Sequence, residues 1–261
     1  MNDTVQWSVT LRDADSAVEI RSEQPDLVLR TASVGKLVLL ATAARLIVGG
    51  RLSPAERLRR TAADAVADSG IWQHLAVDEL AVRDLCQLIG SASDNLATNV
   101  LIRRIGRPEI DATAAQLGLQ HTALLDRVRD FRGPTDPWTL STGSAAELAG
   151  LMAAMAVRRL IDPDVSQLML SWLADGLDLS MVPAGWEWDP LAHSAPGSAV
   201  RLHHKTGTDD GVRCDVGVVI GEWRTVAYAV LANWDPAVGD RRAEVLARMR
   251  EIGCELAALV F

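Results

Sequence analysis

The chain has almost no lysine. Of its 26 basic residues, only Lys36 and Lys205 are lysines, and all the others are arginines. An arginine does not lose its proton at accessible pH, whereas a desolvated lysine does. Both lysines lie in short patterns that suit nucleophilic chemistry, Ser33-Val34-Gly35-Lys36 and Lys205-Thr206-Gly207. We therefore expect these two amines to do something that arginine cannot.

The chain also lacks an excess of positive charge and a long apolar run. Its net charge of −8 argues against nucleic acid as the main partner, because phosphate binding relies on basic surface. The most apolar stretch, from Leu37 to Val48, is too short to cross a bilayer and contains Arg45. The sequence thus predicts no membrane partner.

Cysteine is scarce as well. Cys86, Cys214 and Cys254 are far apart and show no metal-type spacing, which predicts reduced thiols and no metal site. The N-terminus has no basic segment followed by an apolar run, so it shows no signal peptide. We therefore expect a cytoplasmic protein.

Segments with strand character lie at both ends of the chain, and the middle has helical periodicity. The expected strands cover 6–12, 17–21, 200–208, 215–221 and 225–233, and the expected helices cover 33–48, 80–89, 94–105, 108–117, 142–157 and 241–259. Between Leu119 and Leu140 lies an irregular stretch of a length that compact domains seldom carry without a functional reason.

This order predicts a two-lobed fold with an α/β lobe and an all-α lobe. Residues 1–54 and 190–261 would form one mainly antiparallel five-stranded sheet flanked by helices, built from both termini. Residues 55–189 would form an inserted helical lobe, and the cleft would lie where the lobes meet.

Ser33 and Lys36 are three residues apart at an expected helix start, so their side chains share a face. A serine hydroxyl becomes a good nucleophile when a neighbouring neutral amine removes its proton. Burial and a second cation both lower the pKa of a lysine, and Lys205 could be that cation. Taken alone, the pattern is equally typical of a helix-capping serine followed by a solvated lysine.

A third pattern, Ser93-Asp94-Asn95, stands at the start of another expected helix. Alone it is a good capping sequence. In this order, however, the three patterns resemble the signature elements of class A β-lactamases and their penicillin-binding relatives. The resemblance covers nearly the whole chain, including the order of strands, helical lobe and strands.

The resemblance implies a serine hydrolase that forms an acyl-enzyme at Ser33. Lys36 would help to deprotonate Ser33, and Ser93 would relay a proton to the leaving group. The backbone N–H groups of Ser33 and Thr208 would form the oxyanion hole. Lys205 would complete the catalytic set by tuning the proton relay and attracting a substrate carboxylate.

The same resemblance implies a set of substrate-binding residues. Asn95 would hold the amide side chain of the substrate, and Asp94 would brace its loop. Thr206, together with Lys205, would attract the substrate carboxylate and tune the proton relay, and Gly207 would be a further substrate-binding residue. Arg213 is a candidate for a further carboxylate contact, with an exposed strand-end arginine as the alternative. We expect a small-molecule carbonyl substrate bearing a carboxylate, and no cofactor.

One position departs from the family pattern. Class A enzymes use a glutamate in the irregular loop to activate water for deacylation. The start of that loop resembles Leu125-Asp126-Arg127, and Arg129 stands where the glutamate is expected. Arginine cannot act as a general base at neutral pH. Replacing Arg129 with glutamate is then expected to accelerate deacylation, provided that the loop has the family's geometry.

Four acidic residues could substitute for the missing glutamate: Asp126, Asp130, Asp136 and Glu147. For most of them an ordinary structural role fits better. The sequence patterns therefore supply all the residues expected for acylation. They lack the glutamate that usually activates water to release the acyl group. Three functions stay open: a β-lactam hydrolase, an esterase, amidase or acyltransferase of small-molecule metabolism, and a β-lactam-binding protein without turnover.

Two remaining patterns have structural alternatives. His203 and His204 are adjacent on an expected strand and therefore point to opposite faces, which argues against a metal pair. Trp186 and Trp188 could form an aromatic wall beside the cleft or pack in the core.

Overall fold

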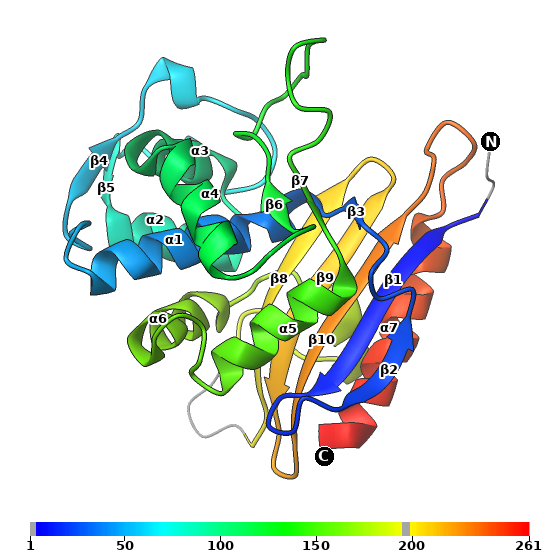
Figure 1. Cartoon of the computed structure of the whole chain (residues 1–261). Helices are drawn as coiled ribbons and strands as arrows, with labels where there is room; N and C mark the ends of the chain where they lie inside the picture. The colour runs from blue at the N-terminus through cyan, green and yellow to red at the C-terminus, as the bar shows by residue number, and fades with distance from the viewer. Residues whose placement is uncertain (1–3, 195–198, 261) are drawn as a thin grey trace.

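A five-stranded antiparallel sheet forms the centre of the molecule. The computed structural model describes residues 4–194 and 199–260. The start of the N-terminal segment, Met1 to Asp3, therefore lies outside the described residues. The strand order is β2-β1-β10-β9-β8, which joins both ends of the chain in one sheet (Figure 1). Its strands are β1 (Gln6–Asp13), β2 (Glu19–Glu23), β8 (Arg201–Asp209), β9 (Val212–Ile220) and β10 (Thr225–Asn233). The predicted fold class is confirmed.

The first hairpin is longer than its sequence predicts. Asp13 Oδ1 accepts hydrogen bonds from the backbone N–H groups of Asp15 and Ser16, and Ala17 has a φ of 60°. The turn therefore includes Ala17, and β2 begins at Glu19 instead of Ala17.

Helices fill the middle of the chain, and a further helix follows the last strand. They are α1 (Lys36–Val48), α2 (Val82–Ala92), α3 (Asn95–Ile105), α4 (Arg107–Gln116), α5 (Ala145–Ala156), α6 (Pro163–Leu173) and α7 (Arg242–Val260). Helix α1 is buried from Lys36 to Ala44 because it is apolar on nearly every side, as a central helix must be. Helices α2, α3, α4 and α6 pack around it (Figure 1).

The sheet separates two apolar cores. One core contains Val216 and Val218 of β9, together with helices α1 and α5. The other contains Val219 of β9 and Tyr228 of β10, and is covered by α7. Alternate residues of one strand thus face different cores, which explains why β9 has no polar face over most of its length.

The packing of α1 and α5 can be compared with the predicted division of the chain into two lobes. Helix α1 packs against α2, α4 and α6, and α5 packs against β1, β9 and β10. These contacts associate α1 with the helices and α5 with the sheet, whereas the sequence assigned α1 to the 1–54 segment of the sheet lobe and α5 to the 55–189 lobe. The division into lobes at those residues stays a proposal.

Short elements connect the irregular loop to the turn before α1. Strands β3 (Leu29–Arg30), β6 (Ala123–Leu124) and β7 (Ser141–Gly143) form a small sheet, and β4 (Arg57–Arg59) pairs with β5 (Glu79–Ala81). The loop between β6 and β7 rises from this sheet at the top of Figure 1. Its two ends are therefore fixed beside the segment that carries Ser33.

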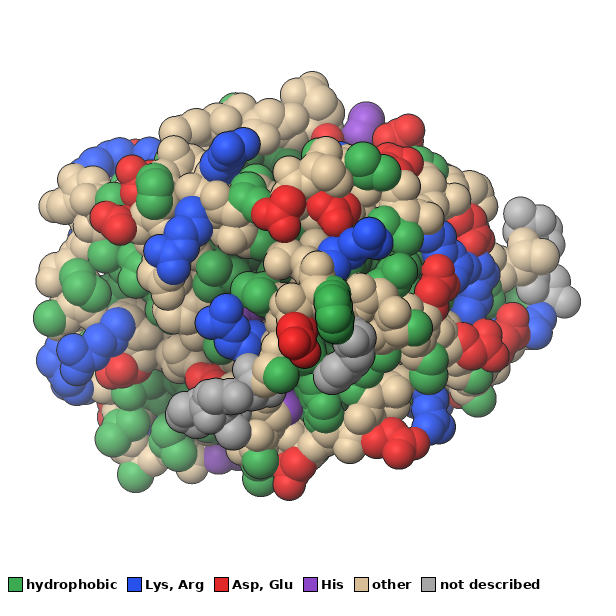
Figure 2. Space-filling view, turned by 90° about the horizontal axis from the view of Figure 1, so that it is seen from below, with side chains coloured by type: hydrophobic (Ala, Val, Ile, Leu, Met, Phe, Trp, Pro, Cys, Tyr) green, Lys and Arg blue, Asp and Glu red, His purple; other side chains and the backbone are tan. Residues whose placement is uncertain are grey.

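Charge on the surface is mixed. On the face drawn in Figure 2, blue and red side chains of the described residues alternate without gathering into a patch of one sign. Across the described residues, no helix has the length and apolar character needed to cross a membrane.

Candidate active site

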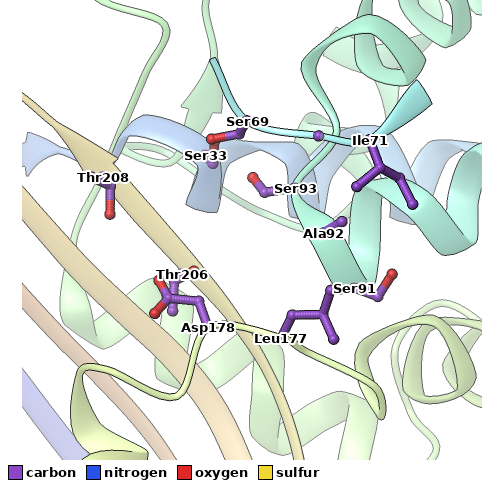
Figure 3. A pocket seen from close by; sticks show the side chains of 11 residues that line it. Ser33, Ser69, Ile71, Ser91, Ala92, Ser93, Leu177, Asp178, Thr206 and Thr208 are labelled. Atoms are coloured by element: carbon purple, nitrogen blue, oxygen red, sulfur yellow. The ribbon is translucent and has the colours of Figure 1, made fainter. Parts of the chain in front are cut away.

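The fold brings the three sequence patterns to one pocket. Ser33 lies in a 3₁₀ turn, η1 (Ala32–Gly35), directly before α1, and Ser93 caps the end of α2. Thr206 and Thr208 come from β8, at the edge of the sheet. All four residues line a pocket of about 410 Å³ (Figure 3). The sequence therefore predicted the elements that meet here.

The turn that carries Ser33 is strained and anchored. Ala32 has a φ of 47°, a conformation that costs a non-glycine residue free energy and that is common next to reactive groups. Ser141 Oγ donates a hydrogen bond to Ala32 O at 2.6 Å and lies 2.7 Å from Thr31 Oγ1. The β7 end of the irregular loop thus holds the turn in place.

Gly207 allows β8 to approach this turn. A Cβ atom at Gly207 would lie 2.2 Å from Thr31 O and 3.2 Å from Ser33 N. Any larger residue would push the edge strand away from η1. This close approach brings Thr208 to the same pocket as Ser33, which is the placement that the predicted oxyanion hole requires.

Lys36 is fully buried, and its amine faces the end of α2. Lys36 Nζ donates to Ser93 O at 2.8 Å and to Asn95 Oδ1 at 2.7 Å, and lies 3.3 Å from Ser93 Oγ. Burial lowers the pKa of Lys36 well below its usual value, and the nearby charge of Lys205 lowers it further, against the opposing charge of Asp94. This direction agrees with the second cation expected from the sequence, and the role of Lys205 stays a prediction.

The amine and the nucleophile are not hydrogen-bonded. Among the described residues, no hydrogen bond joins Ser33 Oγ to Lys36 Nζ, and the contacts of Lys36 go to Ser93 and Asn95. Ser33 and Ser93 nevertheless line the same pocket. Hydrogen bonds of this kind often become short only in the complex with substrate.

The second motif is largely structural. Asp94 Oδ1 accepts from the N–H of Ala97 and so caps α3, and Asp94 Oδ2 accepts from the N–H groups of Ile71 and Trp72. Asp94 therefore braces the loop, as predicted. Ser93 has a φ of 54°, which turns the chain between α2 and α3.

Asn95 is occupied at both ends of its amide. Its Oδ1 accepts from Lys36 Nζ, and its Nδ2 donates to Ala67 O at 3.1 Å. The residue is buried and positions the amine of Lys36. A direct contact between Asn95 and substrate stays a prediction.

Lys205 lies behind the pocket instead of on its surface. Its side chain is buried, and Nζ donates to Thr206 O at 2.9 Å. Burial lowers the pKa of Lys205 to about 8, although the charges of Asp178 and Asp215 oppose this shift. A cation at this position influences the pocket by its electric field, without forming part of the pocket surface.

Arg213 borders a second cavity, which has a volume of about 860 Å³ and shares Ser69 and Thr208 with the pocket of Ser33. Its Nη1 donates to the carbonyl oxygens of Asp209 and Val212. Its guanidinium also lies 5.9 Å from the ring centre of Trp234. The predicted contact of Arg213 with a substrate carboxylate stays a prediction.

Two groups near the site were missed from the sequence. Asp178, on the loop after α6, lines the pocket next to Thr206 (Figure 3). Behind the site, the buried carboxylate of Asp215 accepts from His204 Nδ1 and from Tyr228 Oη, each at 3.0 Å. Neither group belongs to a short motif, so only the fold could reveal them.

The adjacent histidines have separate partners. His203 Nδ1 lies 2.8 Å from Leu170 O, on the α6 side of β8, and His204 contacts Asp215 instead. The two side chains therefore point to opposite faces of the strand, as expected for adjacent strand residues. Among the residues described here, no group of three or more His, Cys, Asp or Glu side chains is arranged to hold a metal ion.

The two tryptophans pack away from the pocket. The rings of Trp186 and Trp188 are tilted by 34° with centres 4.8 Å apart, and both residues lie against the core that α7 covers. Neither of them lines the pocket of Ser33. Core packing, one of the two alternatives left open by the sequence, is the one observed.

Arg129 faces the acidic residues of its own loop. Its Nε donates to Asp126 Oδ2 at 2.7 Å, and its Nη2 pairs with Asp136 Oδ1 at 3.1 Å. Arg132 also pairs with Asp126. A glutamate at position 129 would therefore meet two carboxylates. The condition for accelerated deacylation, that residue 129 faces the nucleophile, does not agree with these contacts.

The acidic residues considered as replacements are used within the protein. The Glu147 carboxylate accepts from the backbone N–H groups of 120–122, and Asp130 Oδ1 accepts from Ala67 N. Asp136 Oδ2 accepts from Gly133 N, in addition to the ion pair with Arg129. These carboxylates brace the loop, which is the structural role that the sequence favoured for Glu147 and Asp136.

Val128 is the loop residue fixed against the helices. Asn99 Oδ1 accepts from Val128 N at 2.9 Å, and Asn99 Nδ2 donates to Val128 O at 3.0 Å. Asn99 lies one turn of α3 beyond Asn95, which binds Lys36. The Val128 side chain packs against the main core. The backbone of position 128 is therefore held beside α3, one helical turn from Asn95.

The charge of Lys205 gives a prediction about pH. Replacing Lys205 with methionine removes a cation that lowers the pKa of Lys36, so that pKa should rise. Because Lys36 accepts a proton only when neutral, the acid limb of the acylation pH profile should move to higher pH. Stopped-flow acylation with an uncharged acyl donor measures this limb. A limb that stays in place or moves to lower pH would contradict the proposed role of Lys36.

The geometry agrees with comparisons to known proteins. The β-lactamase of Sphaerobacter thermophilus superposes with a TM-score of 0.81 at 23% identity, over 98% of this chain and 92% of that one. PBP-A gives a TM-score of 0.81 at 21% identity, over 99% and 91% of the two chains. The class A β-lactamase of Mycobacterium abscessus gives a TM-score of 0.79 at 18% identity, over 98% of this chain and 94% of that one. At identities this low, the TM-scores show a shared fold and no more.

The sequence itself supplies the family. The pattern of the β-lactamase enzyme family matches residues 1–257, which is nearly the whole chain. This match confirms the resemblance that the three motifs carry. The chain belongs to the β-lactamase enzyme family.

Proposed function

We propose that the protein is a serine hydrolase that forms an acyl-enzyme at Ser33 with a β-lactam or a related amide or ester. The observation that supports this most strongly is the buried amine of Lys36 at the pocket of Ser33, with a pKa well below its usual value. A lowered pKa favours the neutral amine, which is the form that can accept a proton from a serine.

The reaction begins when Ser33 Oγ attacks the carbonyl carbon and its proton passes to Lys36 Nζ. The carbonyl oxygen takes up the negative charge, and the N–H groups of Ser33 and Thr208 stabilise it. When the intermediate collapses, the bond to the leaving nitrogen or oxygen breaks. Ser93 Oγ–H gives that atom its proton and regains one from Lys36, which lies 3.3 Å from Ser93 Oγ.

A long-lived acyl-enzyme is the second candidate, and the irregular loop favours it. Water needs a general base to attack the ester at Ser33. The carboxylates of Asp126, Asp136 and Glu147 are engaged in ion pairs or backbone hydrogen bonds. A solved structure of PBP-A, which shares this fold, is a Leu-to-Glu variant as an acyl-enzyme complex with penicillin G.

Mass spectrometry of the protein incubated with penicillin G tests both candidates. The expected result is one adduct per chain, mapped to the peptide that contains Ser33. Rapid loss of the adduct with continued product formation identifies a hydrolase, and a persistent adduct identifies a protein that binds without turnover. If penicillin G gives no adduct, activated esters of small carboxylic acids are tested next. An adduct on any other residue refutes the assignment of Ser33.

A further inference from the structure

The pocket beside Ser33 has an unexpected charge. Of the eleven described residues that line it, Asp178 is the only one with a charged side chain (Figure 3). The others are apolar or carry hydroxyl groups, including Ser69, Ser93 and Thr206. A ligand that enters the pocket therefore meets one carboxylate and several neutral hydrogen-bonding groups.

Asp178 is held in its ionised form. Its Oδ1 accepts from Ser180 Oγ at 2.6 Å and from Ser180 N at 3.1 Å. Burial opposes the charge, but the hydrogen bonds from Ser180 and Thr206 outweigh it and lower the pKa of Asp178 below its usual value. An ionised carboxylate accepts about four hydrogen bonds. Both hydrogen bonds from Ser180 go to Oδ1, so Oδ2 keeps acceptor sites for a further partner.

Among the described residues, no basic side chain lines the pocket beside Asp178, although the charges of Lys205 and Arg213 interact with it from outside. Lys205 is buried and donates to the backbone of Thr206, and Arg213 borders the neighbouring cavity. The Thr206 side chain lies next to Asp178 (Figure 3) and helps to lower the pKa of that carboxyl. A carboxylate placed here would lie close to a fixed carboxylate, and like charges in a partly buried site repel.

Building on the proposed acylation of Ser33, we propose that this pocket binds a cationic group and that the preferred acyl donors carry an ammonium group at Asp178. The negative charge of Asp178 attracts the cation, and the hydroxyl groups and the apolar wall of Ile71 and Leu177 line the space around it. This substrate class differs from the carboxylate-bearing substrate expected from the motifs.

Three para-nitrophenyl esters of equal reach test this assignment. One is the ester of γ-trimethylammoniobutyrate. The second is its neutral isostere, in which carbon replaces the quaternary nitrogen, and the third is the mono-ester of glutarate. After correction for spontaneous hydrolysis, kcat/KM should be about tenfold higher for the cationic ester than for the neutral one, and lowest for the glutarate ester.

The variant Asp178→Asn should bring the ratio of the cationic to the neutral ester close to one. The ratio is measured within one protein sample, so a loss of folded protein cancels. Asp175→Asn is the matched control. Asp175 is exposed, lies on the same loop, contacts Gln87 and Ser194, and does not line the pocket. It should leave the ratio at its original value.

The outcomes separate this inference from the proposed function. Acylation of Ser33 by the neutral ester with no preference for the cation, or with a preference for the glutarate ester, overturns the cationic site and leaves the nucleophile intact. A preference that survives in Asp178→Asn overturns the role of Asp178. If no ester or β-lactam acylates Ser33, the proposed function itself fails.

Discussion

Replacing Lys36 with arginine should lower the rate constant for acylation of Ser33 by two to four orders of magnitude, on the order of the contribution of a positioned general base. Arginine keeps the positive charge and most of the length of lysine, but it cannot become neutral and accept a proton. The burial that lowers the pKa of Lys36 would leave a guanidinium charged. Intact-protein mass spectrometry at timed intervals measures the acylation rate.

Two further variants make this result specific. Lys36→Met removes both base and charge, so it should lose about as much activity as Lys36→Arg if the amine acts as a base. A Lys36→Arg protein that acylates much faster than Lys36→Met would show that the charge is what matters. Lys205→Arg makes the same exchange at the other buried lysine. It should lose less, because Lys205 acts on its surroundings as a cation. Thermal melting of each variant shows whether it is folded.

The part of the site that the sequence predicted consists of residues in contiguous motifs. Ser33 and Lys36 are separated by one helical turn, and Ser93 and Asp94 take their places from the junction of α2 and α3. In each case local geometry fixes the relative positions of the side chains. The sheet was predictable for a related reason, because strand alternation and the position of strands at both ends of the chain leave few possible arrangements.

The part that the sequence did not predict depends on contacts between distant segments. Asp178 acquires its role because the loop after α6 lies against β8, where Thr206 is within hydrogen-bonding reach. The direction of the Asn95 amide towards Lys36 depends on how α1 packs beside α3. In the irregular loop no periodicity exists, so the spacing after Asp126 could not show which of two adjacent residues faces the helices.

The hydrogen bonds of Asn99 show which of the two loop residues is held against the helices. They lead to the second prediction with a large expected effect. The variant Val128→Glu should accelerate release of the acyl group from Ser33 by about tenfold or more, within the range that a general base supplies. Asn99 fixes the backbone of residue 128 from both sides, one helical turn from the residue that binds Lys36. Val128 packs against the main core, so the new carboxylate must turn out of that contact towards Ser33, where it can activate a water molecule for attack on the acyl group.

Arg129→Glu is the matched control for this prediction. It adds the same carboxylate one residue later, where Asp126 and Asp136 already surround the side chain. We expect Arg129→Glu to weaken the loop by like-charge repulsion without accelerating deacylation. The half-life of the Ser33 adduct, followed by mass spectrometry after removal of free β-lactam, measures both variants. Faster release in Arg129→Glu than in Val128→Glu would mean that the loop turns around in the acylated protein, so that residue 129 approaches the ester. Equal half-lives in both variants and the parent would mean that access of water, and not the absence of a base, limits deacylation.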